Sequence, residues 1–178
     1  MEALSKPVLA TPRQPVKTAS AVVFAVALAT ILAALAFEHL GGYVPCPLCL
    51  QQRYAYYFAV PAAALAFYLA HGHTRSAARA LLIAIVVAFL LNAGLGIYHS
   101  GVEWKWWLGP DTCAAGAAAD LGALSVAEQL ANVQVVRCDE AAWRFLGLSF
   151  AGWNAAVSAL LAGVAVWGAA QKPGRARP

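Results

Sequence analysis

The chain has 178 residues, of which 62% are hydrophobic and only 11% are charged, and its mean hydropathy is +0.66. This composition excludes an ordinary soluble domain and indicates an integral membrane protein. The formal net charge of +4 comes from basic residues that flank apolar runs, so it reports membrane topology rather than nucleic-acid binding.

Four apolar runs are long enough to cross a hydrocarbon core, which requires about 20 helical residues. They cover residues 19–37, 54–70, 80–98 and 150–170. The first run is longer than a usual signal-peptide core and lacks a convincing cleavage site, so we expect it to be retained. The sequence therefore predicts one membrane domain over residues 1–178, an all-α bundle of four transmembrane helices with two longer loops, residues 38–53 and 99–149.

The flanking charges predict how this bundle is oriented. The amino-terminal tail, the short second connection and the carboxyl-terminal tail carry a single acid, Glu2, against the basic residues Lys6, Arg13, Lys17, Arg75, Arg79, Lys172, Arg175 and Arg177. Because positively charged flanks stay in the cytoplasm, we expect both termini there and both longer loops on the opposite side. All four cysteines lie in those two loops.

The first loop ends in a Cys-x-x-Cys motif, Cys46 to Cys49, at the start of the second apolar segment. Pro47 suits the first position of a helix, which makes Cys46 the expected N-cap residue. Cys49 then falls in the first turn, near unpaired N–H groups, with Arg53 one turn later on the same face. We therefore expect a stabilised thiolate at Cys49 and an exchange-active pair.

Three other kinds of site could contain such a motif: a zinc site, a covalent haem site and static disulfides. Zinc would require a second closely spaced pair, whereas Cys113 and Cys138 are far apart in the sequence. Covalent haem requires a histidine directly after the second cysteine, and that residue is Leu50. Static disulfides account for four paired cysteines without any chemistry, but they do not explain a pair at a helix start beside an arginine.

The second loop follows the Tyr98-His99 pair and begins with an aromatic cluster, Trp104 to Trp107, of the kind that anchors helices at the membrane interface. Ser125 and Glu128 form a capping box that opens a short amphipathic interfacial helix. A bond between Cys113 and Cys138 would close a loop of about 25 residues, a constraint worth roughly 3–4 kcal/mol.

Three motifs together resemble the DsbB family of quinone-dependent disulfide-forming membrane proteins. They are Cys46-Pro47-Leu48-Cys49 with Arg53, the Tyr98-His99 pair, and the run from Cys138 through Trp143 to Phe145-Leu146-Gly147-Leu148. The resemblance implies a four-helix bundle in the bacterial inner membrane with its cysteine loops in the periplasm. It also implies ubiquinone or menaquinone as the cofactor and a soluble DsbA-type thioredoxin-fold oxidase as the partner.

The same resemblance implies an electron relay. The partner attacks at Cys113, the freed Cys138 attacks Cys46, and Cys49 is released beside the quinone. The implied site consists of the catalytic residues Cys46, Cys49, Cys113 and Cys138, the cofactor-binding residues Arg53 and His99, and no metal ligand. Two alternatives stay open here: a vitamin-K-epoxide-reductase-like quinone and thiol oxidoreductase, and a non-enzymatic membrane scaffold with static disulfides.

Overall fold

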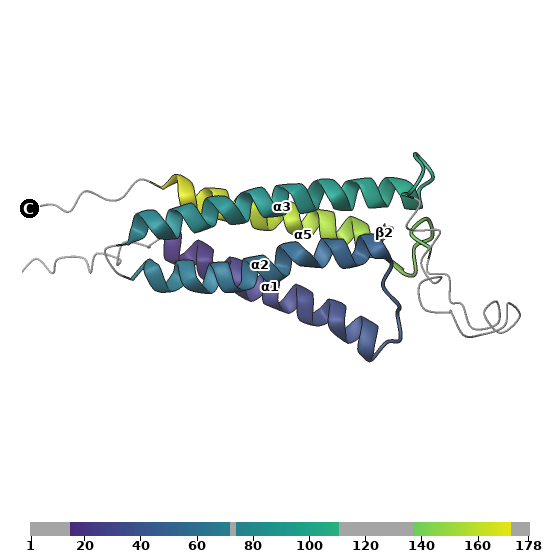
Figure 1. The fold of residues 1–178 in the computed structure, drawn as a ribbon, viewed down its shortest axis with the longest axis horizontal. Helices are drawn as coiled ribbons and strands as arrows, with labels where there is room; N and C mark the ends of the chain where they lie inside the picture. The colour runs from purple at the N-terminus through teal and green to yellow at the C-terminus, as the bar shows by residue number, and fades with distance from the viewer. Residues whose placement is uncertain (1–14, 72–73, 111–136, 172–178) are drawn as a thin grey trace, which may run out of the picture.

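The part of the chain that the structure, a computed structural model, describes consists of residues 15–71, 74–110 and 137–171. It contains four long helices that run along one axis (Figure 1), namely α1 (Pro15–His39), α2 (Pro47–Leu69), α3 (Arg75–Glu103) and α5 (Phe150–Ala170). A short antiparallel hairpin of β1 (Arg144–Phe145) and β2 (Leu148–Ser149) precedes α5. The predicted interfacial helix and Cys113 lie outside the described residues.

The four helices cover the four predicted apolar runs, but three of them are longer than those runs: α1 by a few residues at each end, and α2 and α3 by more. Helix α2 begins at Pro47 rather than at residue 54, and α3 extends from Arg75 to Glu103 rather than over 80–98. Hydropathy locates only the lipid-facing part of a helix, whereas the backbone stays helical wherever nothing interrupts its hydrogen bonds. His99 therefore lies in the last turns of α3, and not in the loop predicted for residues 99–149.

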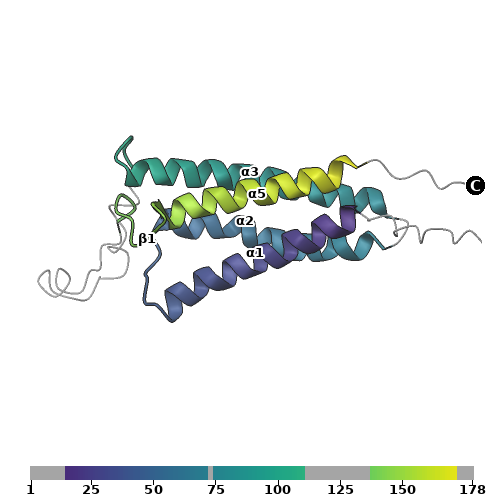
Figure 2. The ribbon, with the colours of Figure 1, turned by 180° about the vertical axis from the view of Figure 1, so that it is seen from behind.

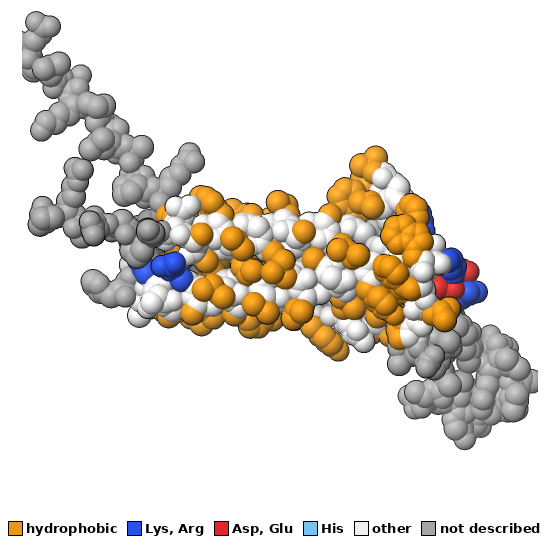
Figure 3. Space-filling view, turned by 90° about the horizontal axis from the view of Figure 1, so that it is seen from above, with side chains coloured by type: hydrophobic (Ala, Val, Ile, Leu, Met, Phe, Trp, Pro, Cys, Tyr) orange, Lys and Arg blue, Asp and Glu red, His pale blue; other side chains and the backbone are white. Residues whose placement is uncertain are grey.

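Helices α1, α3 and α5 are each long and apolar enough to cross a membrane. Helix α2 does not reach the same apolar composition, because its first turns carry Gln51, Gln52 and Arg53. Hydrophobic side chains nevertheless cover the bundle along its length, and charged side chains gather at its two ends (Figure 3). This distribution is typical of a protein surrounded by lipid.

Small residues set how closely the helices approach. Helices α3 and α5 share the most extensive interface. A Cβ atom added to Gly96 of α3 would lie 3.0 Å from the Ala151 carbonyl oxygen of α5, and one added to Gly168 would lie 2.3 Å from the Ala19 Cβ of α1. Because lipid offers no hydrophobic drive for helices to associate, such close backbone contacts stabilise the bundle through dispersion.

The hairpin fixes where α5 begins. Its two turn residues, Leu146 and Gly147, have φ angles of 51° and 82°, the left-handed pair that a type I′ turn requires. Ser149 ends β2 and caps α5, because its hydroxyl accepts the N–H of Gly152 at 3.3 Å. The turn and the cap together hold the segment after Cys138 against the end of the bundle.

Two opposite views show that α1 diverges from the other helices towards its carboxyl end (Figures 1 and 2). The start of α1 and the end of α5 lie together at the other end of the bundle. The divergence is greatest where the chain leaves α1 and enters the cysteine motif at the start of α2.

Candidate active site

The two cysteines of the motif form the first turn of α2, as the sequence predicts. Cys46 is the N-cap residue, in an extended conformation, and Pro47 follows at the first helical position. The Cys46 Sγ accepts the backbone N–H of Cys49 at 3.2 Å and lies 2.8 Å from the Cys49 Sγ. Both thiols are free. This geometry brings the sulfurs close enough to exchange between dithiol and disulfide with little movement of the backbone.

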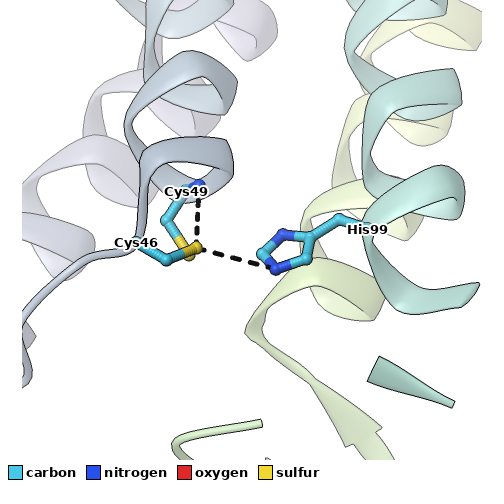
Figure 4. A group of neighbouring side chains, drawn as sticks. All are labelled: Cys46, Cys49 and His99. Carbon is cyan, nitrogen blue, oxygen red and sulfur yellow. Dashed lines mark hydrogen bonds between the residues drawn. The ribbon is translucent and has the colours of Figure 1, made fainter. Parts of the chain in front are cut away.

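His99 approaches this pair from α3 (Figure 4). Its Nε2 lies 3.6 Å from the Cys46 Sγ, and its Nδ1 lies 2.8 Å from the Gln52 Nε2. Because the Gln52 amide nitrogen can only donate, it assigns the proton of a neutral His99 ring to Nε2, facing the sulfur. The imidazole is only 2% exposed. His99 is thus placed to donate a hydrogen bond to a thiolate at Cys46.

The electrostatics favour a thiolate at Cys46. The pKa of Cys46 is lowered to about 5; the hydrogen bond from the Cys49 thiol is the largest cause, burial opposes it, and the facing His99 adds to the lowering. The helix N–H of Cys49 also points at the Cys46 sulfur. The sequence predicts the stabilised thiolate at Cys49 instead. In the described arrangement, the N-cap sulfur receives the helix N–H, because an N-cap atom points back over the first turn.

Two residues of this cluster are not found by the sequence analysis. Gln52 orients the His99 ring, and the buried Glu103 places its carboxylate 3.9 Å from the His99 Nε2. Their spacing in the sequence could have indicated both residues. Gln52 lies three residues after Cys49 and Glu103 lies four residues after His99, so each shares a helix face with a predicted site residue.

Arg53 forms an ion pair with Glu38 near the carboxyl end of α1. The Arg53 side chain is 12% exposed and that of Glu38 is 25% exposed, so the pair is partly removed from water. The pair connects α2 to α1 at the place where the two helices diverge. Arg53 lies one turn after Cys49, as predicted, and its guanidinium has further N–H groups available beyond those that face Glu38.

A cavity of about 330 Å³ lies between α1, α2 and α5 at this end of the bundle. Cys49, Arg53 and Glu38 line its polar part. Much of its wall is apolar, with Ile31, Ala33, Ala34, Phe37, Val44, Pro45, Phe150, Ala151 and Val157. Such a cavity suits a flat apolar ring that carries a few hydrogen-bond acceptors. Among the described residues that line it His99 is absent, because the imidazole faces Cys46 instead.

Cys138 packs against the first cysteine pair. It is 1% exposed and lies in one buried cluster with Cys46 and Leu48. Cys138 is disulfide-bonded, whereas Cys46 and Cys49 are free. The fourth cysteine of the sequence, Cys113, lies outside the described residues. The structure therefore brings three of the four predicted catalytic cysteines together.

A network of charges holds the segment around Cys138. Lys105, which follows the end of α3, donates to the Asp139 carbonyl oxygen at 2.8 Å and pairs with its carboxylate. Arg137 donates two hydrogen bonds to the same carboxylate, each 2.9 Å long. The two cations lower the pKa of Asp139, with Arg137 as the larger cause. These bonds attach Cys138 to the end of α3 without burying a charge.

The donors Cys46, Cys49 and His99 lie within 4.8 Å of one another, as in a metal site. Two thiolates on one tetrahedral zinc ion, each about 2.3 Å from the metal, would lie further apart than the 2.8 Å between these sulfurs. The spacing therefore fits a dithiol that cycles to a disulfide better than it fits a metal centre.

A helical membrane bundle with a reactive Cys-x-x-Cys pair, and a further cysteine packed against it, defines a membrane thiol oxidoreductase. The family model described as "Disulfide bond formation protein DsbB" matches residues 16–168. The chain belongs to the DsbB family of membrane disulfide bond formation proteins. This assignment favours the DsbB interpretation over the vitamin-K-epoxide-reductase-like alternative and over a static scaffold.

Three relatives, each named "Disulfide bond formation protein B", illustrate the similarity. The relative from Aromatoleum aromaticum is 31% identical over 155 residues, which is 85% of this chain and 90% of its own length. The relative from Marinobacter nauticus is 36% identical over 149 residues, or 78% and 83% of the two chains. The relative from Acinetobacter baylyi is 32% identical over 139 residues, or 75% and 79%. No solved structure matches the chain significantly.

Proposed function

We propose that this protein reoxidises a soluble DsbA-type oxidase on the periplasmic side of the bacterial inner membrane and delivers the electrons to a membrane quinone. The observation that carries the proposal is the order of groups at one end of the bundle. Cys138 packs against Cys46, Cys46 contacts Cys49, and Cys49 lines the cavity with Arg53. Electrons that enter at the second loop thus have a continuous path to that cavity.

The relay consists of two thiol–disulfide exchanges. A thiolate of the reduced partner attacks the Cys113 sulfur of a Cys113–Cys138 disulfide, forms a mixed disulfide and releases Cys138 as a thiolate. Cys138 then attacks Cys46 of an oxidised Cys46–Cys49 pair and releases Cys49. The partner's second thiol attacks its own sulfur in the mixed disulfide, so the partner leaves oxidised and Cys113 is released. Re-formation of the Cys113–Cys138 bond by attack of Cys113 on Cys138 leaves Cys46 and Cys49 carrying the two electrons.

The residues around Cys46 assist the step in which its sulfur leaves. When Cys113 attacks Cys138 in the bond between Cys138 and Cys46, Cys46 departs as a thiolate. A low pKa makes it a good leaving group, and the helix N–H and His99 stabilise the charge that forms. Gln52 keeps the imidazole in the tautomer that donates to this sulfur. We therefore assign His99 to the exchange step rather than to direct contact with the quinone.

Thermodynamics requires a stronger oxidant at the end of the relay. A DsbA-type partner lies near −120 mV, and a dithiol pair near −180 mV would receive its electrons uphill by about 2.8 kcal/mol. Bound quinone supplies a two-electron acceptor that is soluble in the bilayer. Cys49 and Arg53, which line the cavity, would hold the quinone, and the guanidinium would stabilise negative charge at this end of the cavity. The acceptor in this proposal is ubiquinone or menaquinone.

The proposal is tested by reconstituting the full chain in nanodiscs with ubiquinone and adding a reduced DsbA-type protein. We expect partner thiols to disappear in step with the ultraviolet absorbance of the quinone. Cys113→Ser should abolish oxidation of the partner while the Cys46–Cys49 pair remains oxidisable by added quinone. Cys49→Ser should stop quinone reduction by any thiol. Partner oxidation that continues anaerobically without quinone, after the disulfides of the protein itself have been consumed, would refute the proposal, as would cysteines whose redox state never responds to partner or quinone.

A further inference from the structure

A cluster of polar side chains lies inside the bundle, beyond the cysteines along α2. Tyr56 of α2 donates to the Oδ1 of Asn154 of α5 at 2.8 Å, and its hydroxyl lies 3.3 Å from that of Ser158. Asn92 of α3 donates through its Nδ2 to the Asn154 Oδ1 at 3.2 Å and to the Ser158 hydroxyl at 3.0 Å. The cluster connects three helices by interhelical hydrogen bonds at membrane depth.

One donor in this cluster is unused. The Nδ2 of Asn154 is buried and has no hydrogen-bond partner among the described residues. The amide cannot simply rotate to use it, because two donors, from Tyr56 and Asn92, already fix the Oδ1. A buried N–H group without a partner is costly in an apolar environment, where water is scarce. Its retention points to a partner that arrives with a ligand.

Asn154 also lines the cavity that contains Cys49 and Arg53 in its wall, as does Tyr56. Along α2 the rise from Cys49 to Tyr56 is about 10 Å, at 1.5 Å per residue. The cavity therefore extends from the thiol and the guanidinium at the end of the bundle to the amide of Asn154 deeper in the membrane.

Four other polar side chains of the cavity wall, Thr30, Trp153, Gln52 and Tyr56, already form hydrogen bonds within the bundle. The Thr30 hydroxyl donates to the Val26 carbonyl oxygen at 2.8 Å, and the Trp153 Nε1 donates to the Phe145 carbonyl oxygen at 3.1 Å. Gln52 is bonded to His99, and the Tyr56 hydroxyl already donates to Asn154. Among the described residues of the wall, the remaining N–H groups of Arg53 and the Tyr43 hydroxyl are donors near the cysteine motif, and the Asn154 Nδ2 is the unpaired donor deeper in the bundle.

A quinone ring carries two carbonyl oxygens on opposite sides, and both accept hydrogen bonds only. We propose that Asn154 donates a hydrogen bond through its Nδ2 to the quinone carbonyl that faces away from Arg53. Asn154 is thus a quinone-binding residue, and Tyr56 and Asn92 are positioning residues that orient and polarise its amide. This inference rests on the proposed function, because it concerns the ligand of the same cavity.

The experiment compares two substitutions in the full-length protein, both of which remove an amide of the cluster and replace it with a side chain of similar size. Asn154→Leu removes the donor at the cavity, whereas Asn92→Leu removes a bond of the same cluster from a residue that does not line the cavity. Asn154→Ala is made in parallel, because it introduces no steric conflict. The probe is ubiquinone with one isoprene unit, labelled with ¹³C at either carbonyl carbon.

Two readouts are independent of turnover. Equilibrium binding, followed by quenching of tryptophan fluorescence, should show about tenfold weaker binding in both Asn154 variants, which is the loss expected for one well-placed hydrogen bond. Infrared difference spectra should show that the stretching band of one labelled carbonyl moves to higher frequency in those variants, while the other carbonyl is unchanged. Asn92→Leu removes a bond that orients Asn154 but leaves its Nδ2 donor in place, so it should weaken binding clearly less than either Asn154 variant, even if its melting temperature falls.

The outcomes separate the two proposals. Wild-type protein that binds and reduces no quinone would reject the proposed function together with this inference. Wild-type binding with unchanged affinity and unchanged carbonyl bands in the Asn154 variants would reject the inference alone. Equal loss of quinone affinity in Asn154→Leu and Asn92→Leu, in proportion to their loss of thermal stability, would assign the cluster a purely structural role and would also reject it.

Discussion

The acid strength of the Cys46 thiol is the property of this site that a titration measures most directly. In the structure its pKa falls from an ordinary value of 9.0 to about 5, chiefly because Cys49 donates a hydrogen bond, with a smaller effect of His99. In the test protein Cys46 is the only thiol: Cys113 and Cys138 are replaced by serine, and Cys49 is replaced as well. Position 49 is then varied between serine, which still donates, and alanine, which does not.

The magnitude decides which assay is informative. At pH 7 a thiol with a pKa of 9.0 is about 1% ionised, whereas one with a pKa of about 5 is about 99% ionised, a gain of about a hundredfold. The same shift makes the thiolate about 40- to 100-fold less nucleophilic, for a Brønsted coefficient of 0.4–0.5. The two effects nearly cancel in an alkylation rate at a single pH. The midpoint of a pH titration does not suffer from this cancellation.

We therefore expect the ultraviolet thiolate absorbance of the Cys49→Ser protein to titrate in the acid range, close to pH 5. Cys49→Ala should raise the midpoint by several units because it removes the largest cause, and His99→Phe should raise it by less. The matched control is Cys46→Ser with Cys49 as the only thiol. A Cys46 midpoint near 9 together with an acidic midpoint for Cys49 would refute this reasoning and would return the stabilised thiolate to Cys49.

The remaining predictions concern stability and the other two parts of the site. Folding lowers the pKa of Cys46, so the stabilisation that its thiolate provides is complete above pH 9 and is lost as the pH falls through 5. The melting temperature of the reduced protein should therefore decline over this range more than that of Cys46→Ser. Parallel declines of the two melting temperatures would contradict the shift. Arg53→Ala should weaken quinone binding, measured by fluorescence quenching, about tenfold while both disulfides still form, and lysine at this position should rescue binding in part. Glu38→Gln combined with Arg53→Ala should restore thermal stability, because it removes the unpaired carboxylate, but it should not restore quinone binding. Lys105→Ala should change the free energy of unfolding by less than about 1 kcal/mol, because its ion pair with Asp139 is exposed. It should slow the quinone reduction that the partner drives and leave the quinone reduction that dithiothreitol drives unchanged. Equal slowing of the two reactions would contradict a role of Lys105 at Cys138. Gly96→Ala should lower the melting temperature, because the added Cβ would lie 3.0 Å from the backbone of α5 and such overpacking costs about 1–3 kcal/mol. The control Gly94→Ala should leave the melting temperature unchanged or raise it, because the space around Gly94 is open and alanine favours the helix.

Features that depend on residues close together in the chain can be predicted from the sequence alone. The apolar runs predict the positions of the four described helices, because the cost of exposing polar groups to lipid acts on each segment separately. The N-cap at Cys46 and the helix start at Pro47 are confirmed, because both follow from the conformational preferences of adjacent residues. The spacing from Cys49 to Arg53 places both side chains on one helix face, and both line the same cavity.

Contacts between side chains of different helices depend on the packing of the bundle and cannot be predicted from local sequence patterns. The contact between Cys46 and His99 joins residues 53 apart in the chain, and the one between Tyr56 and Asn154 joins residues 98 apart. Such contacts depend on the distance between the helices and on the rotation of each helix about its axis. Close approaches, such as that of Gly96 to α5, determine both. For the same reason the prediction of a thiolate at Cys49 does not include the donors that the described geometry directs at Cys46. The helix macrodipole gives the whole first turn a positive potential and does not distinguish the two cysteines. In the structure, one N–H group and one imidazole point at the Cys46 sulfur.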